Sequence, residues 1–186
     1  MRLDGTGVQQ VTRSPMQESN ADWSPDGKAI AFDNLTTGGG IWIVRRDASG
    51  HWGEPVQRQQ GGFNPYWSPD GKSIAYLNTQ EGGKLLVVPA DSGAAQILVD
   101  PSVNGLRPET AIWGAGPFLY YEARDGAGKT SIWSIPAAGG ASRLLVRFDP
   151  VLHPLNRSWL TLQNGILYFL AEDRESDVWV MEVRKP

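Results

Sequence analysis

Nearly the same phrase occurs twice in this chain, and the repetition limits what the chain can fold into. Residues 21–32 read ADWSPDGKAIAF and residues 65–76 read PYWSPDGKSIAY. Tryptophan continues at similar spacing beyond the two phrases. One series runs Trp23, Trp67, Trp113, Trp159, and a second runs Trp42, Leu86, Trp133, Trp179. Self-similarity at a fixed period is typical of repeat architectures, in which each repeat is one supersecondary unit.

The period of about 45 residues predicts the kind of unit, since four-stranded propeller blades have this length. We therefore expect an all-β fold, a β-propeller of four-stranded antiparallel blades with about four blades in the chain. Residues 1–186 form one propeller domain in this interpretation. Its repeat units lie near 21–57, 65–98, 111–145 and 157–184.

Each unit divides into short strands separated by turns. In the first unit, Pro25 and Gly27 are suited to a tight turn between strands at 21–24 and 29–32, because proline presets φ and glycine accepts a positive φ. The runs AIAF, IWIV and ILYFLA are apolar on both faces. A half-exposed strand alternates apolar and polar residues, so these runs favour sheets that are covered on both sides.

The ends of the sequence are compatible with more than one way of closing the ring of sheets. The fourth unit lacks a fourth strand, and residues 2–12 resemble one. Residues 8–12 would pair with 178–183 and close a four-bladed ring, which removes exposed sheet edges. In the alternative interpretations, residues 2–12 finish a blade of a longer propeller, or a homodimer completes a larger ring.

Composition excludes several classes of protein. The net charge of −3 argues against a nucleic-acid surface, which needs clustered Lys and Arg. The absence of cysteine excludes disulfides and thiolate metal sites. We expect no signal peptide, because residues 1–10 contain no apolar stretch of 7 or more residues. The sequence also has no apolar stretch of the roughly 18 residues needed for a membrane span. Its compartment stays undetermined.

Catalytic and metal-binding patterns are not found in the sequence. His51 and His153 lack the partner spacing of a metal site, and Ser24 and Ser68 stand in turns rather than in a G-x-S-x-G elbow. The carboxylate run AEDRESD lacks calcium-loop spacing, and no glycine cluster precedes a helical pattern. We expect no catalytic residue, no metal and no cofactor.

A polar residue stands three positions before each tryptophan of the first series. These residues are Asn20, Asn64, Thr110 and Asn156. In a propeller, the loops that join neighbouring units share one face with one set of hairpins. The four residues would ring the mouth of the channel there, unless the asparagines only cap their own loops. The long loops 99–110 and 147–157 add Arg107, Glu109, His153 and Arg157 as candidate contacts.

The phrase WSPDGK-x-IA followed by an aromatic or apolar strand resembles the TolB-type repeat of the WD40-like propellers. Residues 23–27 and 67–71 match its turn motif, whereas Trp113 and Trp159 match by spacing only. The resemblance covers nearly the whole chain. It implies a bacterial propeller that binds a protein or ligand, with the periplasm as one compartment. Such repeats also form sensor halves of bacterial regulators and lids of prolyl-oligopeptidase-like enzymes.

These observations favour a non-enzymatic binding module that holds a protein or a small-molecule ligand on its loop face. Two alternatives stay open. The first is a hydrolase or lyase, or the propeller lid of a peptidase, with a site built from scattered loop residues. The second is a truncated part of a larger propeller sensor domain. Fold resemblance alone does not decide among them.

Overall fold

The computed structural model describes most residues of the chain. They are residues 4–13, 15, 17–36, 39–78, 82–114, 116–148, 160–170 and 178–182.

The described residues form four antiparallel sheets, three with four strands and one with three. Sheet one contains β1 (Glu18–Trp23), β2 (Ala29–Asn34), β3 (Gly40–Arg45) and β4 (Val56–Gln60). Sheet two contains β5 (Phe63–Trp67), β6 (Ser73–Asn78), β7 (Lys84–Pro89) and β8 (Gln96–Val99). Sheet three contains β9 (Arg107–Trp113), β10 (Phe118–Arg124), β11 (Thr130–Pro136) and β12 (Arg143–Arg147). Sheet four contains β13 (Leu160–Gln163), β14 (Ile166–Leu170) and β15 (Val178–Glu182).

The WSPDG turn forms through its own side chains. Ser24 Oγ donates to Asp26 Oδ1 at 2.7 Å, and the same hydroxyl accepts from the amide of Ala29 at 2.8 Å. Gly27 has a φ of 68°, which glycine adopts without steric cost. Ser68 and Asp70 repeat the pattern in sheet two. The recurring phrase is therefore the turn that joins the first two strands in each of the first two sheets.

Register confirms that the described tryptophans of each series occupy equivalent positions. Trp23 pairs with Ile30, Trp67 with Ile74 and Trp113 with Leu119, at the end of the first hairpin of each sheet. The members of the second series all pair with an aromatic residue of the neighbouring strand, as Trp42↔Phe32, Leu86↔Tyr76, Trp133↔Tyr121 and Trp179↔Phe169. Trp159 lies outside the described residues. Leu162 takes the corresponding place in sheet four.

The core lies between the sheets rather than within any one of them. Ala31 and Ile41 of sheet one pack with Ile74 and Tyr76 of sheet two in one cluster of buried residues. The opposite face of sheet two contributes Leu85 and its neighbours to a second cluster, which sheet three completes. Strands β2 and β6 are buried on both faces, as the apolar runs predict. Each sheet therefore depends on its neighbours for most of its hydrophobic stabilisation.

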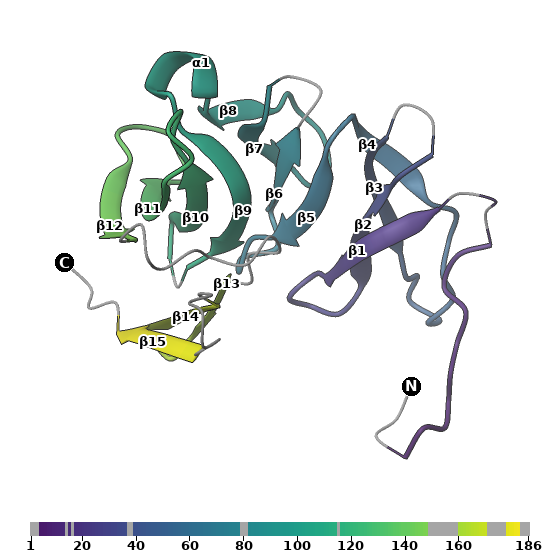
Figure 1. The fold of residues 1–186 in the computed structure, drawn as a ribbon. Coiled ribbons are helices and arrows are strands. Elements are labelled where there is room, and N and C mark those ends of the chain that lie inside the picture. The colour runs from purple at the N-terminus through teal and green to yellow at the C-terminus, as the bar shows by residue number, and fades with distance from the viewer. Residues whose placement is uncertain are drawn as a thin grey trace.

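The sheets are arranged as a fan (Figure 1). Their first strands lie innermost, where β1 contacts β5, β5 contacts β9, and β9 contacts β13. Sheet one lies at the right of Figure 1, followed by sheet two, sheet three and then sheet four at the lower left. This radial order of sheets, with the first strand of each near a common axis, is the arrangement that the repeat predicts.

The predicted closure of the ring by residues 8–12 is not confirmed. Residues 4–13 form no strand, and Figure 1 shows this segment beside sheet one rather than sheet four. Val11 packs against the cluster of Ile30, Phe32 and Val44 in sheet one. The apolar attraction of that face explains the difference, because it gives the N-terminal segment a packing site next to its own sheet.

Two further features complete the fold. The long loop before β9 contains a short helix, α1 (Pro101–Asn104), which was not expected. Asp100 caps it by accepting from the amide of Ser102, and Gly105 ends it in a left-handed conformation. Among the described residues, no helix has the length and apolar character that crossing a membrane requires.

Replacing Leu85 with alanine tests the packing between sheets. Leu85 is fully buried between sheets two and three, so the substitution leaves a cavity. We expect the free energy of unfolding to fall by about 2–5 kcal/mol in urea titrations. The control is Val103→Ala on the exposed surface of α1, which is expected to change it by less than about 0.5 kcal/mol. Equal effects of the two substitutions would contradict the packing.

Candidate functional site

The polar residues of the innermost strands are set by a break in strand pairing. The register of β1 with β2 shifts between Ser19 and Asp22, and that of β5 with β6 shifts between Phe63 and Tyr66. Asn20 lies within the first break, with a φ of 46°. Asn64 lies within the second, with a φ of 51°. Asparagine tolerates this left-handed conformation better than most residues, which explains its recurrence three positions before tryptophan.

Asp33 joins these two irregular segments. Its side chain belongs to a fully buried residue of β2, and its Oδ2 accepts from Asn20 Nδ2 at 2.7 Å. The same carboxylate accepts from the Ser19 hydroxyl and from the backbone amide of Asn64 at 2.8 Å. The bond to Asn64 crosses from sheet one to sheet two. A buried carboxylate that accepts several hydrogen bonds fixes the groups around it.

Two more hydrogen bonds link neighbouring sheets near the axis. Asp22 Oδ2 accepts from the backbone amide of Trp67 at 2.7 Å. Trp113 Nε1 donates to the backbone carbonyl of Tyr66 at 2.8 Å. The first bond joins β1 to β5, and the second joins β9 to β5. The inner strands are therefore held by directional bonds in addition to the apolar packing farther out.

Tyr66 extends the polar group towards sheet three. Its hydroxyl is hydrogen-bonded to the side chain of Thr110, and burial raises the pKa of the phenol, with the nearby charges of Asp22 and Asp33 acting in the same direction. Thr110 is itself buried and is paired in register with Glu122, another buried residue. We call Asn20, Asp22, Asp33, Asn64, Tyr66 and Thr110 the axial polar cluster.

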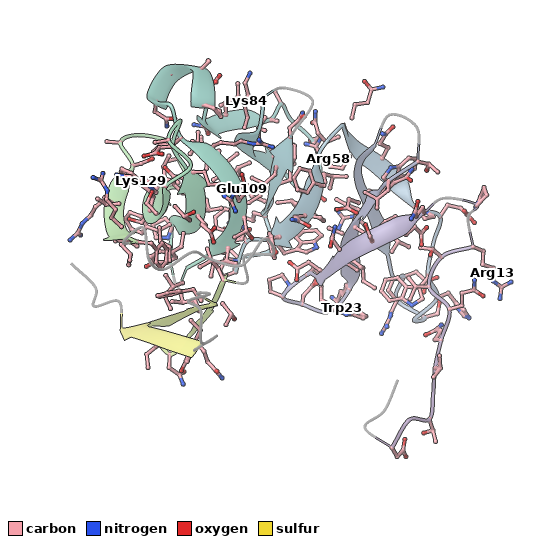
Figure 2. All side chains as sticks on the ribbon, viewed as in Figure 1. Arg13, Trp23, Arg58, Lys84, Glu109 and Lys129 are labelled. Atoms are coloured by element: carbon pink, nitrogen blue, oxygen red, sulfur yellow. The ribbon has the colours of Figure 1, made fainter. Side chains whose placement is uncertain are left out.

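Arg107 and Glu109 lie on β9, which follows α1 in the chain. Glu109 is labelled in Figure 2. Arg107 Nε is 3.7 Å from Glu109 Oε1, and the side chain of Arg107 is 62% exposed. A Cβ atom at Gly83 would be 3.1 Å from Arg107 Cγ, so Arg107 lies over the hairpin that precedes β7. Lys84 Nζ in turn lies 3.4 Å from Asp100 Oδ2. These contacts place the loop before β9 next to the β6–β7 hairpin.

The structure thus brings some of the predicted site residues together. Asn20 and Asn64 meet through Asp33, and Thr110 joins them through Tyr66. Arg107 and Glu109 contact each other. His153, Asn156 and Arg157 lie outside the described residues.

Asp22, Asp33 and Tyr66 are not among the site residues that the sequence predicts. A signal for Asp33 was present, because it is a charged residue directly after the apolar run AIAF, in a strand that is buried throughout. Glu122 interrupts the run FLYYEAR in the same way. Register places Asp33 and Glu122 at corresponding positions of sheets one and three, next to the residue pair formed with the second tryptophan series. A buried charge normally requires partners, so both residues could have been singled out.

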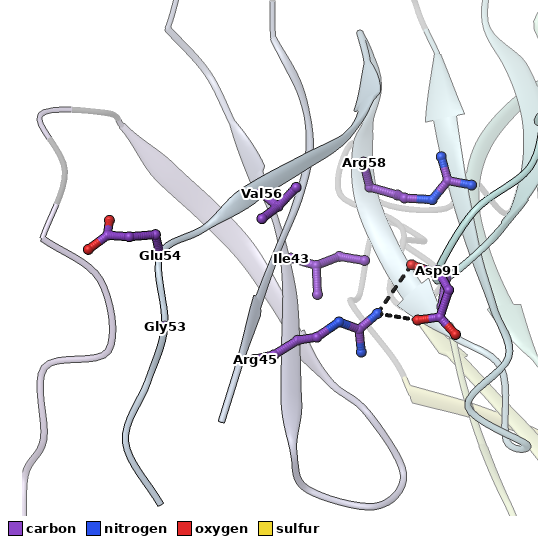
Figure 3. A pocket seen from close by; sticks show the side chains of 8 residues that line it. Ile43, Arg45, Gly53, Glu54, Val56, Arg58 and Asp91 are labelled. Carbon is purple, nitrogen blue, oxygen red and sulfur yellow. Dashed lines mark hydrogen bonds and ion pairs between the residues drawn. The ribbon is translucent and has the colours of Figure 1, made fainter. Parts of the chain in front are cut away.

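A separate groove of about 240 Å³ opens between sheets one and two (Figure 3). None of the predicted site residues lines it. Arg45 Nη2 contacts Asp91 Oδ1 at 2.8 Å across it, and Arg58 Nε donates to the carbonyl of Pro89 at 2.7 Å. Both guanidinium groups are used to join sheet one to the β7–β8 hairpin. The groove is therefore part of the contact between sheets one and two. The axial polar cluster, together with Arg107 and Glu109, is the stronger candidate site.

Comparison with protein-family models gives no match, and comparison with curated proteins gives none either. Solved structures do match. A protein assigned as TolB from Agrobacterium tumefaciens aligns with a TM-score of 0.70 and 19% identity over 91% of this chain and 63% of the other. A prolyl endopeptidase has a TM-score of 0.65, with 16% identity over 98% of this chain and 30% of the other. TolB from Acinetobacter baumannii has a TM-score of 0.60, with 18% identity over 99% and 48%.

These similarities show that the chain has a β-propeller fold like that of TolB, in agreement with the resemblance of its repeat. The chain spans less than two thirds of the length of each of these proteins. At this level of identity the comparison concerns the fold.

Replacing Asp22 with asparagine tests the electrostatics of the axial polar cluster. Burial raises the pKa of Asp22 above the ordinary 3.8, against the hydrogen bond from Trp67. Between pH 3.8 and the raised pKa of Asp22, the folded state therefore binds more protons than the unfolded state. The stability of the native protein relative to Asp22→Asn is therefore expected to fall as the pH rises through this window. Urea unfolding between about pH 3 and about pH 7 measures the difference.

Asp70→Asn is the matched control, for which the expected pH dependence of stability has the opposite sign. The hydroxyl of Ser68 and the amide of Lys72 lower the pKa of Asp70. Its contribution to stability is present above the ordinary pKa and is lost as the pH falls. The stability of the native protein relative to Asp70→Asn is thus expected to rise with pH. Curves of the same sign for both variants would contradict the described environment of Asp22.

Proposed function

We propose that this chain is a non-enzymatic binding module of the TolB-like propeller type, holding a segment of a protein partner or a small polar ligand on its loop face. The observation that carries the proposal is the axial polar cluster. Asp33 fixes Asn20 and Asn64 across two sheets, yet Asn20 remains exposed. Polar groups held in place before binding lose little conformational entropy when a ligand arrives.

The surroundings of the cluster supply groups of both charges. Arg107 is largely exposed and Glu109 is partly so, and both belong to the strand that also carries Thr110. An amide, a guanidinium and a carboxylate can bind peptide backbone groups, carboxylates and amines. In the proposal, His153, Asn156 and Arg157, which lie outside the described residues, contribute further contacts. Loops on a rigid scaffold commonly provide such binding residues.

A selection from a displayed peptide library, followed by calorimetry on a selected peptide, tests the binding module. In the variant, Asn20→Gly is combined with Arg107→Ala, because glycine keeps the left-handed backbone while removing the amide. We expect the Kd to rise at least tenfold, which corresponds to about 1.4 kcal/mol. Arg107→Ala combined with Arg157→Ala is expected to have a similar effect.

Lys28→Ala combined with Lys72→Ala is the control for this binding experiment. Both lysines are exposed. They follow the WSPDG residues and lie past the C-terminal ends of β1 and β5, whereas Asn20 and Asn64 lie within those strands. Binding of the selected peptide should be unchanged. If the axial variant binds as well as the native protein, or if the lysine variant loses binding equally, the proposed site is wrong.

A second candidate function rests on the similarity to the prolyl endopeptidase, which extends over 98% of this chain and 30% of the peptidase. In this alternative the chain is the propeller part of a hydrolase, and loop residues contribute to its site. Incubation with chromogenic peptide and ester substrates tests it, with His153→Ala as the comparison. Turnover that disappears in the variant would favour the hydrolase. No turnover by the native chain would count against catalysis by the chain alone.

A further inference from the structure

The groove between sheets one and two combines apolar surface with two arginines. Ile43, Val56 and Ala90 supply apolar surface, and Arg45 and Arg58 supply the positive charges. Val56 is 67% exposed, so apolar surface stays uncovered here although the two sheets are in contact. A concave, mainly apolar lining with a few polar groups is common in sites for small molecules.

The two arginines stand where the next two sheets have apolar residues. Arg58 is the extra residue in the irregular pairing of β4 with β3. The same irregularity recurs in sheets two and three, where the extra residues are Leu98 and Leu145. Both leucines pack against apolar clusters. Arg45, which pairs with the first residue of β2, has proline at the corresponding position in both other sheets.

Val56 also differs from its counterpart. Register places Gln96 of β8 at the position that Val56 has in β4. Gln96 Nε2 donates to the backbone carbonyl of Ala138 at 3.0 Å and so reaches from sheet two to the hairpin of sheet three. Valine has no donor for such a bond. The side chain that links sheets two and three is therefore replaced, between sheets one and two, by one that leaves the groove accessible.

Arg58 is held in place without a partner of opposite charge. Its Nε donates to the carbonyl of Pro89 at 2.7 Å, and its Nη2 donates to the carbonyl of Gly93 at 2.8 Å. Within the described part of the chain, no carboxylate forms an ion pair with Arg58. A guanidinium group has five N–H donors, so two carbonyls fix its orientation and leave further donors for a ligand.

The charges around Arg58 leave the groove positive. Arg45 Nη2 donates to the carbonyl of Ala90 at 3.3 Å and to Asp91 Oδ1 at 2.8 Å, so Asp91 balances the charge of Arg45. Both arginines extend towards the side of the groove where Asp91 lies, whereas the side chain of Glu54 points away from it (Figure 3). Two guanidinium groups and one carboxylate leave one positive charge without a counterpart on that side.

We propose that this groove binds a small apolar molecule that carries one carboxylate. A single negative charge matches the single positive charge, and the planar carboxylate fits the guanidinium fork. The apolar body covers Ile43 and Val56, which an inorganic anion would leave in contact with water. The volume of about 240 Å³ suits about eight heavy atoms, if each takes about the 30 Å³ of a water molecule in the liquid. Hexanoate has this size.

NMR titrations of the native chain with hexanoate, hexanol and inorganic phosphate test the proposal. Hexanol has the same apolar body without the charge, and phosphate has the charge without the body. We expect hexanoate to shift the methyl signals of Ile43 and Val56 and to bind with a Kd about tenfold or more below those of the other two. An equal Kd for hexanol or for phosphate, or no shift of these signals, overturns the proposal. The test is independent of the axial polar cluster.

Two variants take their new residues from the other sheets of the chain, which the fold already accepts at these positions. Arg58→Leu introduces the residue of β8 and β12. It is expected to raise the Kd of hexanoate about tenfold and to leave that of hexanol unchanged. Val56→Gln introduces the residue of β8 that reaches the neighbouring hairpin. It is expected to weaken binding of both molecules, because the new side chain occupies the groove.

Arg143→Leu is the matched control. Arg143 is an exposed residue at the corresponding end of β12, so the variant loses the same charge from another sheet and should bind hexanoate as the native chain does. Three results contradict the proposal: equal weakening by Arg143→Leu and Arg58→Leu, native affinity in Val56→Gln, and a Kd for N-acetyl-alanyl-leucine about tenfold below that of hexanoate. The last result would identify the C-terminus of a peptide as the occupant.

Discussion

The structure depends on burial of β-strands on both of their faces. A single sheet of this chain cannot hide two apolar surfaces, and Ile41 of sheet one and Tyr76 of sheet two are buried only because the two sheets lie against each other. Each added sheet covers one apolar face and exposes another, which then requires a further sheet. The radial order of the sheets follows from this requirement, since successive first strands such as β1 and β5 meet near a common axis.

The hydrogen bonds near the axis complement that packing. Apolar contact holds the sheets together but has little directional preference, whereas the bonds from Asn64 to Asp33 and from Trp67 to Asp22 fix how one inner strand lies against the next. Burial of the same carboxylates costs free energy, because they are removed from water. Retaining such groups where simple apolar residues would suffice is a common property of binding sites. The axial polar cluster is thus both a structural link and the basis of the proposed binding role.

Most of the fold could be predicted from the sequence, because the same pattern of turn residues and tryptophans recurs in successive units. The WSPDG turns and the second tryptophan series occupy the expected positions, and register confirms them. The place of the N-terminal segment could not be predicted. Residues 8–12 have the composition of a strand, but their position depends on which apolar face offers them a packing site, and Val11 packs against sheet one.

The candidate site was predictable only in part, for a related reason. Asn20 and Asn64 were found by their spacing, since a left-handed residue in a recurring bulge leaves a recurring asparagine. Asp33 is distant from them in sequence, and its role arises only when β2 lies next to both β1 and β5. Contacts of this kind depend on the packing of whole sheets. A repeat pattern in one sequence indicates the sheets but not which polar atoms meet between them.

Native-state hydrogen exchange tests most directly whether the sheets stabilise one another. In this account the amides of β6 and β7, covered by a sheet on either side, exchange only with unfolding of the whole domain and are the slowest in the chain. The amides of the outer strands β4 and β8 exchange faster, through local opening. If β6 and β7 exchanged no more slowly than β4 and β8, the sheets would be separate units, and the central claim would be wrong.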